Sequence, residues 1–525
     1  MSSARDLLLH SSAPLGYEKT HPAPTRRGVI RVKATLTVDP YRIIGAIDPN
    51  IYGQFLSRRK WVADVALYNP SHPDADESGL RRSVVEAIAA SAPPIIRWPG
   101  GCTGTSYDWR DGIGPQEERS RTIDVQFGYD VGNGFGTAEF VSFCRRIGAQ
   151  PHLNLSTGLG TLRDALEWVE YCNYAGDSKF ANLRRKHGYD EPFNVRYWQI
   201  GNENYGAWEV GQHTPQEYAT IAREWGKAIK KLEPALKVLA VGGSEKNVWW
   251  DAHVLDQAWP YIDYLSAHRY WNFNSDTGDH RYDEIAAVGY AEELSMKAVA
   301  GQIESFARMH RTTRRPKIAF TEWNCSNKAF PSMSPEWRPG RSSFRLVDAL
   351  AVAGFINAMQ RQCQWVALGS FAQSINLVGM LMVTEEHIVK ETVYWPLLML
   401  RRFSGSLAVD CWADCEGYTV LFKERELQGV PYIDASATLD QDNGRLVLSL
   451  VNRHPSDEAA LSLRLRDVKI NHSATLRQLY HENALKMNTI EEPDAVVPQE
   501  REINVANGEI VLPPHSFSLI EMQLG

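Results

Sequence analysis

Short apolar runs alternate with segments of helical apolar spacing between about residue 50 and residue 400. The eight apolar runs span residues 51–55, 95–98, 151–155, 195–200, 237–241, 262–267, 317–320 and 365–372. Between them, apolar residues recur at helical intervals over 80–90, 138–147, 162–171, 217–232, 292–307 and 346–359. Strands that alternate with helices predict an α/β fold with a parallel sheet. An open doubly wound sheet has the same local pattern, but the count of eight strands favours a closed (β/α)8 (TIM) barrel.

After Arg402 the apolar residues alternate with polar ones, as they do in half-buried strands. Leu446, Leu448 and Leu450 follow this period of two, and residues 461–465 repeat it. Asn-Gly pairs at 443–444 and 507–508 stand beside alternating apolar residues and predict type I′ hairpins. The pattern predicts an antiparallel, jelly-roll-like β-sandwich after the barrel.

The first segment of the chain also contains a period-two stretch, with apolar residues at positions 32, 34, 36 and 38. We expect this strand to pair into the distant sandwich. The predicted organisation is an N-terminal segment over 1–48, a catalytic barrel over 49–400 and an antiparallel sandwich over 401–525.

Composition and charge exclude several classes of protein. The chain is 43% hydrophobic and 23% charged, which is typical of a packed globular protein. Its net charge of −7 predicts no attraction to nucleic acid or an anionic membrane. Neither a signal-peptide core nor an apolar run long enough to span a membrane is visible. The seven cysteines are odd in number and scattered, which suits a reducing compartment, so we expect a cytoplasmic protein.

The sequence predicts neither a metal nor a cofactor. Cys411 and Cys415 are the closest cysteine pair, and no histidine ligand pattern accompanies them. Gly158 and Gly160 follow a predicted strand and open a helix, as in a dinucleotide-binding fingerprint, but Arg163 replaces the third glycine. A nucleotide-dependent oxidoreductase is therefore a distant alternative.

Polar residues follow the predicted barrel strands at the rim where barrel enzymes place their catalytic groups. These strand ends read RWPGG at 97–101, GNEN at 201–204, HRYW at 268–271 and TEWN at 321–324, with Gln373 after the eighth strand. Two of the rim residues are glutamates, Glu203 and Glu322, on strands that lie on roughly opposite sides of the ring. Paired carboxyl groups suit glycoside hydrolysis, because one protonates the leaving oxygen while the other attacks or activates water.

These residues resemble the α-L-arabinofuranosidases of glycoside hydrolase family 51. The matching segments are RWPGGC (97–102), WRDGIGP (109–115), FGTAEF (135–140), EWVEYCN (167–173), YWQIGNEN (197–204) and TEWN (321–324). They follow the family's order along the barrel, and the C-terminal sandwich matches too.

The resemblance implies a retaining exo-glycosidase with Glu203 as the acid/base and Glu322 as the nucleophile. It also implies that Asn202 bonds the sugar 2-hydroxyl and that His268 and Tyr270 orient the carboxyls. Repulsion between two neighbouring carboxyls predicts a raised pKa for Glu203.

Three further roles follow from the resemblance. Arg97 would favour the ionised form of Glu322, and Gln373 and Trp109 would line the sugar pocket.

The chain departs from the family pattern after the first barrel strand. The family carries there a glutamate that contacts hydroxyls of the terminal sugar, whereas this chain has Ser57, followed by Arg58, Arg59 and Lys60. Arg58 or Arg59 could enter the pocket edge and select a different furanoside. The alternative, which we favour slightly, is that these three residues form a solvated loop.

The sequence thus predicts an enzyme that releases terminal α-L-arabinofuranosyl residues from oligosaccharides. A glycosidase of the same mechanism for another sugar, such as a galactofuranosidase or an endo-glucanase, is the first alternative. A carbohydrate-binding or scaffold protein without catalysis is an alternative of another class, which the two rim glutamates oppose. The resemblance also implies a homo-oligomer, either a trimer or a hexamer.

Overall fold

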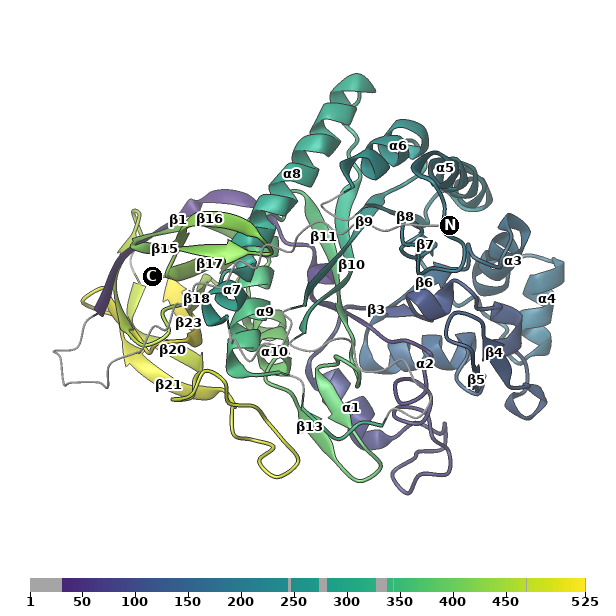
Figure 1. Ribbon diagram of the computed structural model, residues 1–525, viewed down its shortest axis with the longest axis horizontal. Coiled ribbons are helices and arrows are strands. Elements are labelled where there is room, and N and C mark those ends of the chain that lie inside the picture. Colours follow the sequence, from purple (N-terminus) through teal and green to yellow (C-terminus); the bar gives the residue numbers. More distant parts are fainter. Residues whose placement is uncertain are drawn as a thin grey trace, which may run out of the picture.

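Eight parallel strands close into a barrel, which confirms the predicted fold class. The computed structural model describes residues 31–243, 247–272, 281–326, 338–342, 344–468 and 470–524. The barrel strands are β2 (Gly53–Phe55), β3 (Ile95–Trp98), β6 (Gln150–Leu155), β7 (Tyr197–Ile200), β8 (Lys237–Val241), β9 (Tyr264–Asn272), β10 (Lys317–Ser326) and β11 (Val366–Ala372). Figure 1 shows this barrel on one side of the molecule and a sheet domain on the other.

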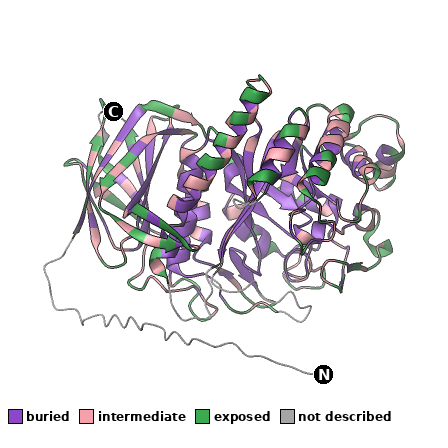
Figure 2. Cartoon of the chain, turned by 45° about the horizontal axis from the view of Figure 1, so that its top comes forward, coloured by how far each residue is buried: buried purple, intermediate pink, exposed green. Residues whose placement is uncertain are grey.

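Helices surround the barrel and turn their apolar faces to its strands. They are α1 (Arg82–Ala90), α2 (Thr137–Ile147), α3 (Leu162–Asn173), α4 (Lys179–Lys186), α5 (Pro215–Leu232), α6 (Val248–Ala258), α7 (Tyr282–Ala286), α8 (Val288–Met309), α9 (Leu346–Arg361) and α10 (Tyr394–Phe403). Figure 2 shows buried residues along the strands and exposed residues on the outer helix faces. This is the division that helical apolar spacing predicts.

Short elements fill the loops at the barrel mouth and beside the second domain. The 3-10 turns are η1 (Pro49–Tyr52), η2 (Cys102–Gly104), η3 (Trp109–Gly112) and η4 (Gln116–Glu118). Three two-stranded sheets join β4 (Thr122–Asp124) to β5 (Tyr129–Val131), β12 (Leu381–Val383) to β13 (Ile388–Lys390), and β15 (Gly417–Phe422) to β16 (Arg425–Pro431).

The C-terminal domain is a nine-stranded sheet around its own apolar core. Its strands are β1 (Arg31–Ala46), β14 (Leu407–Cys415), β17 (Ile433–Asp440), β18 (Arg445–Asn452), β19 (Glu458–Leu465), β20 (Ile470–Leu479), β21 (Gln499–Asn504), β22 (Glu509–Leu512) and β23 (Ser516–Leu524). β21 and β22 form opposite edges, yet only a short turn separates them in sequence. The sheet therefore curls until its edges approach each other, which gives a sandwich-like domain.

The alternating segment near the start of the chain lies in β1. This strand pairs antiparallel with β14 and parallel with β19, in the middle of the sheet. Residues 1–30 of the expected N-terminal segment lie outside the described residues.

The two Asn-Gly predictions fail in different ways: residues 443–444 lie in a β17–β18 hairpin whose turn is not type I′, whereas residues 507–508 join strands that do not pair with each other. A type I′ turn needs positive φ at two central residues. Gly444 has φ of 60°, but Asn443 is not among the residues with positive φ, and a four-residue loop joins β17 to β18. The turn containing Asn507 and Gly508 (φ 66°) joins β21 to β22, which pair with β20 and β19 instead of with each other.

Helix α9 lies between the two domains and is buried from Leu346 to Gln360. It contacts β10 on the barrel side and β17, β18 and β23 on the sheet side. A helix buried on all sides is mostly apolar, as this one is, and its buried polar residues Asp348, Asn357 and Gln360 are hydrogen-bonded.

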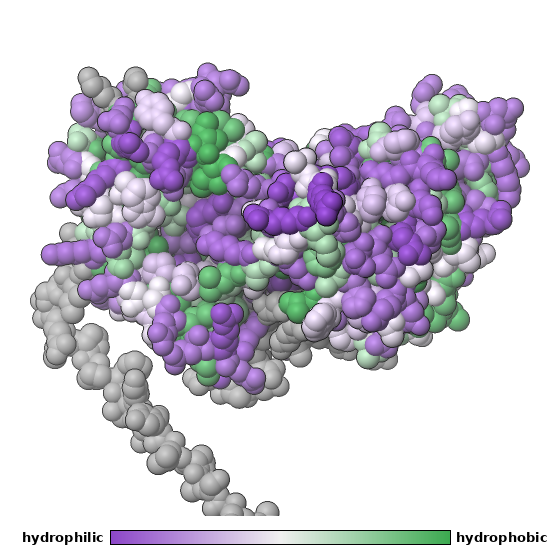
Figure 3. Space-filling view, turned by 90° about the horizontal axis from the view of Figure 1, so that it is seen from above, coloured by the Kyte–Doolittle hydropathy of each residue, from purple (hydrophilic) through white to green (hydrophobic). Residues whose placement is uncertain are grey.

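In the part of the chain that the structure describes, no helix is both long enough and apolar enough to cross a bilayer. The face drawn in Figure 3 is mostly hydrophilic, with hydrophobic side chains in small patches.

Candidate active site

Glu203 and Glu322 both lie at the carboxyl-terminal rim of the barrel strands. Glu203 follows β7 in a tight turn, where Gly201 has φ of 82° and Glu203 itself has φ of 43°. A positive φ is unfavourable for a residue with a side chain, so the surrounding contacts must hold this turn. Glu322 lies within β10, which extends to Ser326, beyond the predicted end at residue 320.

His268 on β9 bridges the two glutamates. Its Nδ1 lies 2.7 Å from Glu203 Oε1 and 3.8 Å from Glu322 Oε2. Its Nε2 lies 3.0 Å from Thr321 Oγ1, which fixes the plane of the ring. One ligand atom from each of these three side chains lies within 4.8 Å of the others, so the two carboxyl groups face each other at short range.

Arg97 joins Glu322 to Asn202. Its Nη1 donates to Glu322 Oε1 at 2.6 Å, and its Nη2 donates to Asn202 Oδ1 at 2.8 Å. Arg97 and Asn202 are both fully buried. A Cβ on Gly101 would lie 2.3 Å from Glu322 Oε1, so this position of the RWPGGC segment accepts only glycine.

Tyr270 holds the other oxygen of Glu322. Its hydroxyl donates to Glu322 Oε2 at 2.7 Å. Burial and the neighbouring Glu322 carboxylate raise the pKa of Tyr270 well above its ordinary value. The phenol therefore stays protonated and remains a donor.

The pKa of Glu203 differs in direction from the prediction. Burial acts to raise it, but hydrogen bonds from His268 and Trp208 and the charges of His268 and Arg97 outweigh burial and lower it. Trp208 Nε1 donates to Glu203 Oε2 at 2.9 Å. The prediction of a raised pKa was wrong because it counted the repulsion from Glu322 and left out these donors.

Ser57 and Gln373 lie side by side at the mouth. The Ser57 backbone N–H donates to Gln373 Oε1 at 3.2 Å. Ser57 is 2% exposed, and its hydroxyl has no hydrogen-bond partner among the described residues. Ser57 is thus buried, and its hydroxyl is free to bind a ligand.

The favoured interpretation of Arg58 and Arg59 as a solvated loop was wrong, because both side chains are buried. Arg58 Nη2 donates to Asn133 Oδ1 at 2.9 Å, and its guanidinium lies over the Tyr107 ring. Arg59 Nε donates to the Tyr129 hydroxyl at 3.1 Å and its guanidinium lies over the Phe127 ring. These contacts direct both guanidinium groups toward the segment around β4 and β5.

Trp109 lies in η3 and contacts α3. Its Nε1 donates to the Asp164 carbonyl at 3.0 Å, and its ring is parallel to Trp168 at a centroid distance of 6.2 Å. Trp109, Tyr107, Leu155, Leu159 and Trp168 line a cavity of about 240 Å³. The structure brings Arg97, Asn202, His268 and Tyr270 together around the glutamates, whereas the contacts of Trp109 belong to this cavity.

The sequence analysis assigned no role to Trp208, Glu209 or Cys102. Trp208 and Glu209 lie in the short loop between β7 and α5, and Cys102 begins η2. The sequence contained one signal for Glu209. It is an acidic residue that follows Glu203 in the same strand-to-helix loop, and such loops form the mouth of a barrel.

Two groups of described residues have the ligand spacing of a metal site, Cys102 with Glu203 and Glu209, and Glu203 with His268 and Glu322. Both contain Glu203, so a cation bound at either group would contact the Glu203 carboxylate. Burial and the charges of Glu203 and Glu209 raise the pKa of Cys102 well above its ordinary value, which keeps the thiol protonated.

Comparisons with known proteins agree on one family. Residues 87–286 match the model of an α-L-arabinofuranosidase 1 domain, and residues 321–516 match that of an α-L-arabinofuranosidase C-terminal domain. A probable α-L-arabinofuranosidase C of Aspergillus terreus is 34% identical over 93% of this chain and 97% of its own length.

A bacterial relative and a solved structure extend this similarity. The intracellular exo-α-(1→5)-L-arabinofuranosidase of Halalkalibacterium halodurans is 29% identical over 87% of this chain and 92% of its own. The thermostable GH51 α-L-arabinofuranosidase of Thermotoga petrophila superposes with a TM-score of 0.83 at 31% identity, over 93% of this chain and 99% of that chain.

Proposed function

Because the chain belongs to the glycoside hydrolase family 51 α-L-arabinofuranosidases, we propose that it releases terminal α-L-arabinofuranosyl units from oligosaccharides with retention of anomeric configuration. The observation that carries the proposal is the approach of the Glu203 and Glu322 carboxyl groups to within 4.8 Å, with His268 between them. Retaining glycosidases place these groups about 5–5.5 Å apart, and inverting ones about 6.5–9.5 Å apart.

In the first step, Glu322 attacks the anomeric carbon and Glu203 protonates the leaving oxygen. Arg97 and Tyr270 each occupy one Glu322 oxygen, which aims the carboxylate and leaves a lone pair for attack. His268 Nδ1, 2.7 Å from Glu203 Oε1, is placed to supply the proton that Glu203 transfers. The products are a glycosyl ester on Glu322 and the free leaving alcohol.

In the second step, Glu203 accepts a proton from water as the water attacks the same anomeric carbon. The ester bond to Glu322 breaks, and the sugar leaves with its original configuration. Asn202 bonds the sugar 2-hydroxyl in both steps, a contact that strengthens as positive charge develops on the ring. Gln373 and the Ser57 hydroxyl bind hydroxyls at the far end of the sugar.

A different furanoside, such as a galactofuranoside, is the second candidate substrate. Ser57 favours it, because a small buried hydroxyl stands where the family has a glutamate. Turnover of a panel of 4-nitrophenyl furanosides and pyranosides separates the candidates, and the highest kcat/KM on the α-L-arabinofuranoside supports the proposal. A higher value on any other sugar contradicts it.

Substitution of the two glutamates tests their roles. Glu322→Ala should abolish turnover of every substrate, because no glycosyl ester can form. Glu203→Ala should lose far more activity on substrates with poor leaving groups than on nitrophenyl ones, and azide should restore its rate. Glu217→Gln, in the N-terminal cap of α5, is the control and keeps wild-type kinetics. Appreciable activity in Glu322→Ala, or uniform loss without azide rescue in Glu203→Ala, contradicts the assignment.

We further propose that the enzyme acts inside the cell as a homo-oligomer, a trimer or a hexamer. The Halalkalibacterium relative is named intracellular, which supports the first part. Light scattering of the purified full-length chain tests the oligomeric state, and a monomer at micromolar concentration contradicts the proposed homo-oligomer.

A further inference from the structure

The amide of Asn202 is held from both sides. Arg97 Nη2 can only donate, so it contacts Oδ1, and the Asn202 Nδ2 group must face the other way. On that side Nδ2 donates to Glu209 Oε1 at 3.2 Å. Arg97 and Glu209 together therefore fix the direction of the amide. The second amide hydrogen has only a long contact, at 3.9 Å, with Cys102 Sγ, which a ligand oxygen can replace.

Backbone hydrogen bonds hold Glu209 close to Glu203. The N–H of Gly206 donates to the carbonyl of Glu203, and the N–H of Glu209 donates to the carbonyl of Gly206. Gln126, in the β4–β5 turn, forms hydrogen bonds with the residues on either side of Glu209. Its Nε2 donates to the Trp208 carbonyl at 2.6 Å, and its Oε1 accepts from the Val210 N–H at 2.9 Å. The loop is thus folded to deliver one carboxyl group to the mouth of the barrel.

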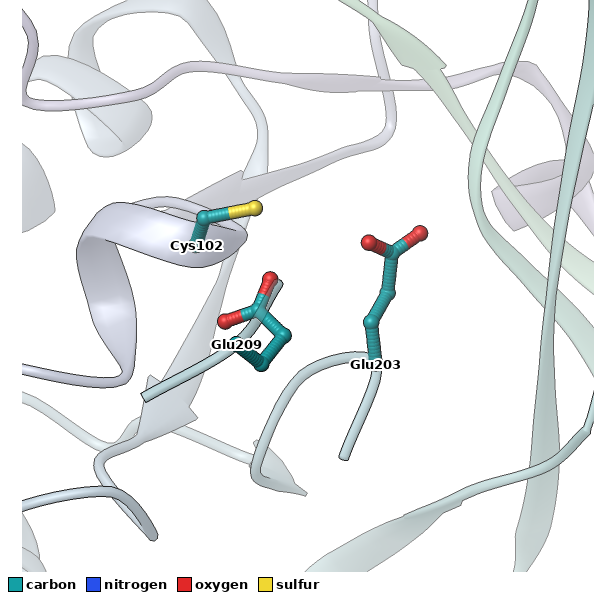
Figure 4. A group of neighbouring side chains, drawn as sticks. All are labelled: Cys102, Glu203 and Glu209. Carbon is teal, nitrogen blue, oxygen red and sulfur yellow. The ribbon is translucent and has the colours of Figure 1, made fainter. Parts of the chain in front are cut away.

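The Glu209 side chain is buried and fully engaged. It is 5% exposed, and its second oxygen accepts from Thr105 Oγ1 at 3.3 Å. Figure 4 shows its carboxyl group beside the Cys102 thiol, with the Glu203 side chain next to both. Ligand atoms of these three residues lie within 4.8 Å of one another. Glu209 is therefore a third carboxyl group within the site, in addition to the acid/base and the nucleophile.

Burial of a carboxyl group here is costly. Burial raises the pKa of Glu209, the Cys102 thiol lowers it, and the charges of Glu203 and Glu322 raise it again, to about 7. A glutamate at this position destabilises the folded protein above its unperturbed pKa, where an amide or apolar side chain would not. This cost is consistent with a role in activity.

We propose that Glu209 is a positioning residue that acts through Asn202, holding its amide so that one N–H points at the 2-hydroxyl of the bound sugar. The inference rests on the proposed function and adds a residue to it. The contact with the 2-hydroxyl grows in the transition state, so loss of Glu209 should lower kcat more than it raises KM.

A double-mutant cycle on 4-nitrophenyl α-L-arabinofuranoside tests the route through Asn202. Glu209→Ala alone should lower kcat on the order of 10- to 100-fold, the size expected when a catalytic contact is misplaced. In the Asn202→Ala background, Glu209→Ala should lower kcat by less than about 2-fold, because the amide that Glu209 orients is absent. Equal losses in the two backgrounds overturn the proposal.

Glu209→Gln is the second variant, since it keeps the size of the side chain and an oxygen that accepts from Asn202. The ratio of wild-type kcat to Glu209→Gln kcat should be larger at pH 8 than at pH 6. Above pH 7 the wild-type carboxylate is ionised and binds the amide more strongly than a neutral oxygen can. A merely structural role predicts the same ratio at both pH values, and that result overturns the proposal.

Glu217→Gln is the matched control, because it changes an exposed glutamate on the helix that follows the same loop. Wild-type turnover of the arabinofuranoside tests the proposed function separately. If the wild type is active and the effects of Glu209→Ala and Asn202→Ala on kcat are additive, the proposed role of Glu209 is wrong while the proposed function stands.

Discussion

Each of the four oxygens of Glu203 and Glu322 has its own donor or histidine partner. His268 and Trp208 hold Glu203, and Arg97 and Tyr270 hold Glu322. Fixed donors around a carboxylate restrict its rotation before substrate arrives, and such preorganisation lowers the free energy of the transition state. At the residue scale, the site is thus a set of oriented carboxyl groups.

Ser57→Glu tests whether position 57 sets the sugar preference. A carboxylate here could accept hydrogen bonds from sugar hydroxyls, each contributing roughly 1.5–3 kcal/mol. We expect kcat/KM for 4-nitrophenyl α-L-arabinofuranoside to rise about tenfold or more, with a smaller rise in the uncharged control Ser57→Gln. Unchanged kcat/KM in Ser57→Glu would show that this position does not set specificity.

At the scale of elements, the loops behind β7 and β8 hold buried carboxyl groups against backbone N–H groups and side-chain donors. Glu209 belongs to the first loop. After β8, Asp251 of α6 accepts from the Gly243 N–H of the loop at 2.6 Å and is 3% exposed. Burial raises the pKa of Asp251 to about 7, although the Gly243 bond and the charge of Arg269 act to lower it.

Asp251→Asn should remove a pH-dependent loss of stability. The unfolded chain releases the Asp251 proton near pH 3.8 and the folded chain only near pH 7, so the wild type loses stability as pH rises through this window. The gain from Asp251→Asn should therefore be about 2–3 kcal/mol larger at pH 8 than at pH 5. Denaturant unfolding of the wild type and of Asp251→Asn at both pH values measures this difference in stability.

Asp256→Asn is the control for this comparison, because Asp256 is exposed on the same helix. It should change the free energy of unfolding by the same small amount at both pH values. If Asp251→Asn and Asp256→Asn behave alike, Asp251 does not have the raised pKa that its burial implies.

At the scale of the whole molecule, α9 and the sheet domain share a buried polar cluster centred on Asp434 of β17. Asp434 is 5% exposed. It accepts from Asn357 at 2.8 Å and pairs with Arg361 and Arg453 at 3.1 Å each. These contacts fix the sheet domain against α9 and so against the barrel.

Asp434→Ala should lower the free energy of unfolding by about 3–5 kcal/mol, because the buried Arg453 loses its carboxylate partner and Arg361 keeps only its pair with Glu293. Asp410→Ala removes the partner of Arg42, whose side chain is 67% exposed, and should cost less than about 1 kcal/mol. Denaturant unfolding at neutral pH compares the two variants. Equal costs would show that the cluster does not stabilise the contact between domains.

The barrel and the positions of Glu203 and Glu322 at its rim could be predicted because they depend on local pattern. Apolar runs mark the strands, and the polar residues that follow them converge at one rim. Side-chain partners could not be predicted in this way. Arg58 and Arg59 are buried by Asn133 and Tyr129, which lie 75 and 70 residues further along the chain.

The errors in the sequence analysis share this physical cause. The pKa of Glu203 depends on donors from β9 and from its own loop. The pairing of the strands on either side of Asn507-Gly508 depends on the curl of the whole sheet. Glu209 lies near Glu203 in sequence, but its contact with Asn202 follows from the fold of the loop that Gln126 clasps.

The stereochemistry of the first product tests the two-glutamate retaining mechanism most directly. Proton NMR of an α-L-arabinofuranoside during hydrolysis resolves the anomer that forms before mutarotation. The close approach of Glu203 and Glu322 predicts that the α-anomer appears first and converts slowly to the equilibrium mixture. Initial appearance of the β-anomer would contradict this mechanism and the role of Glu322 as nucleophile.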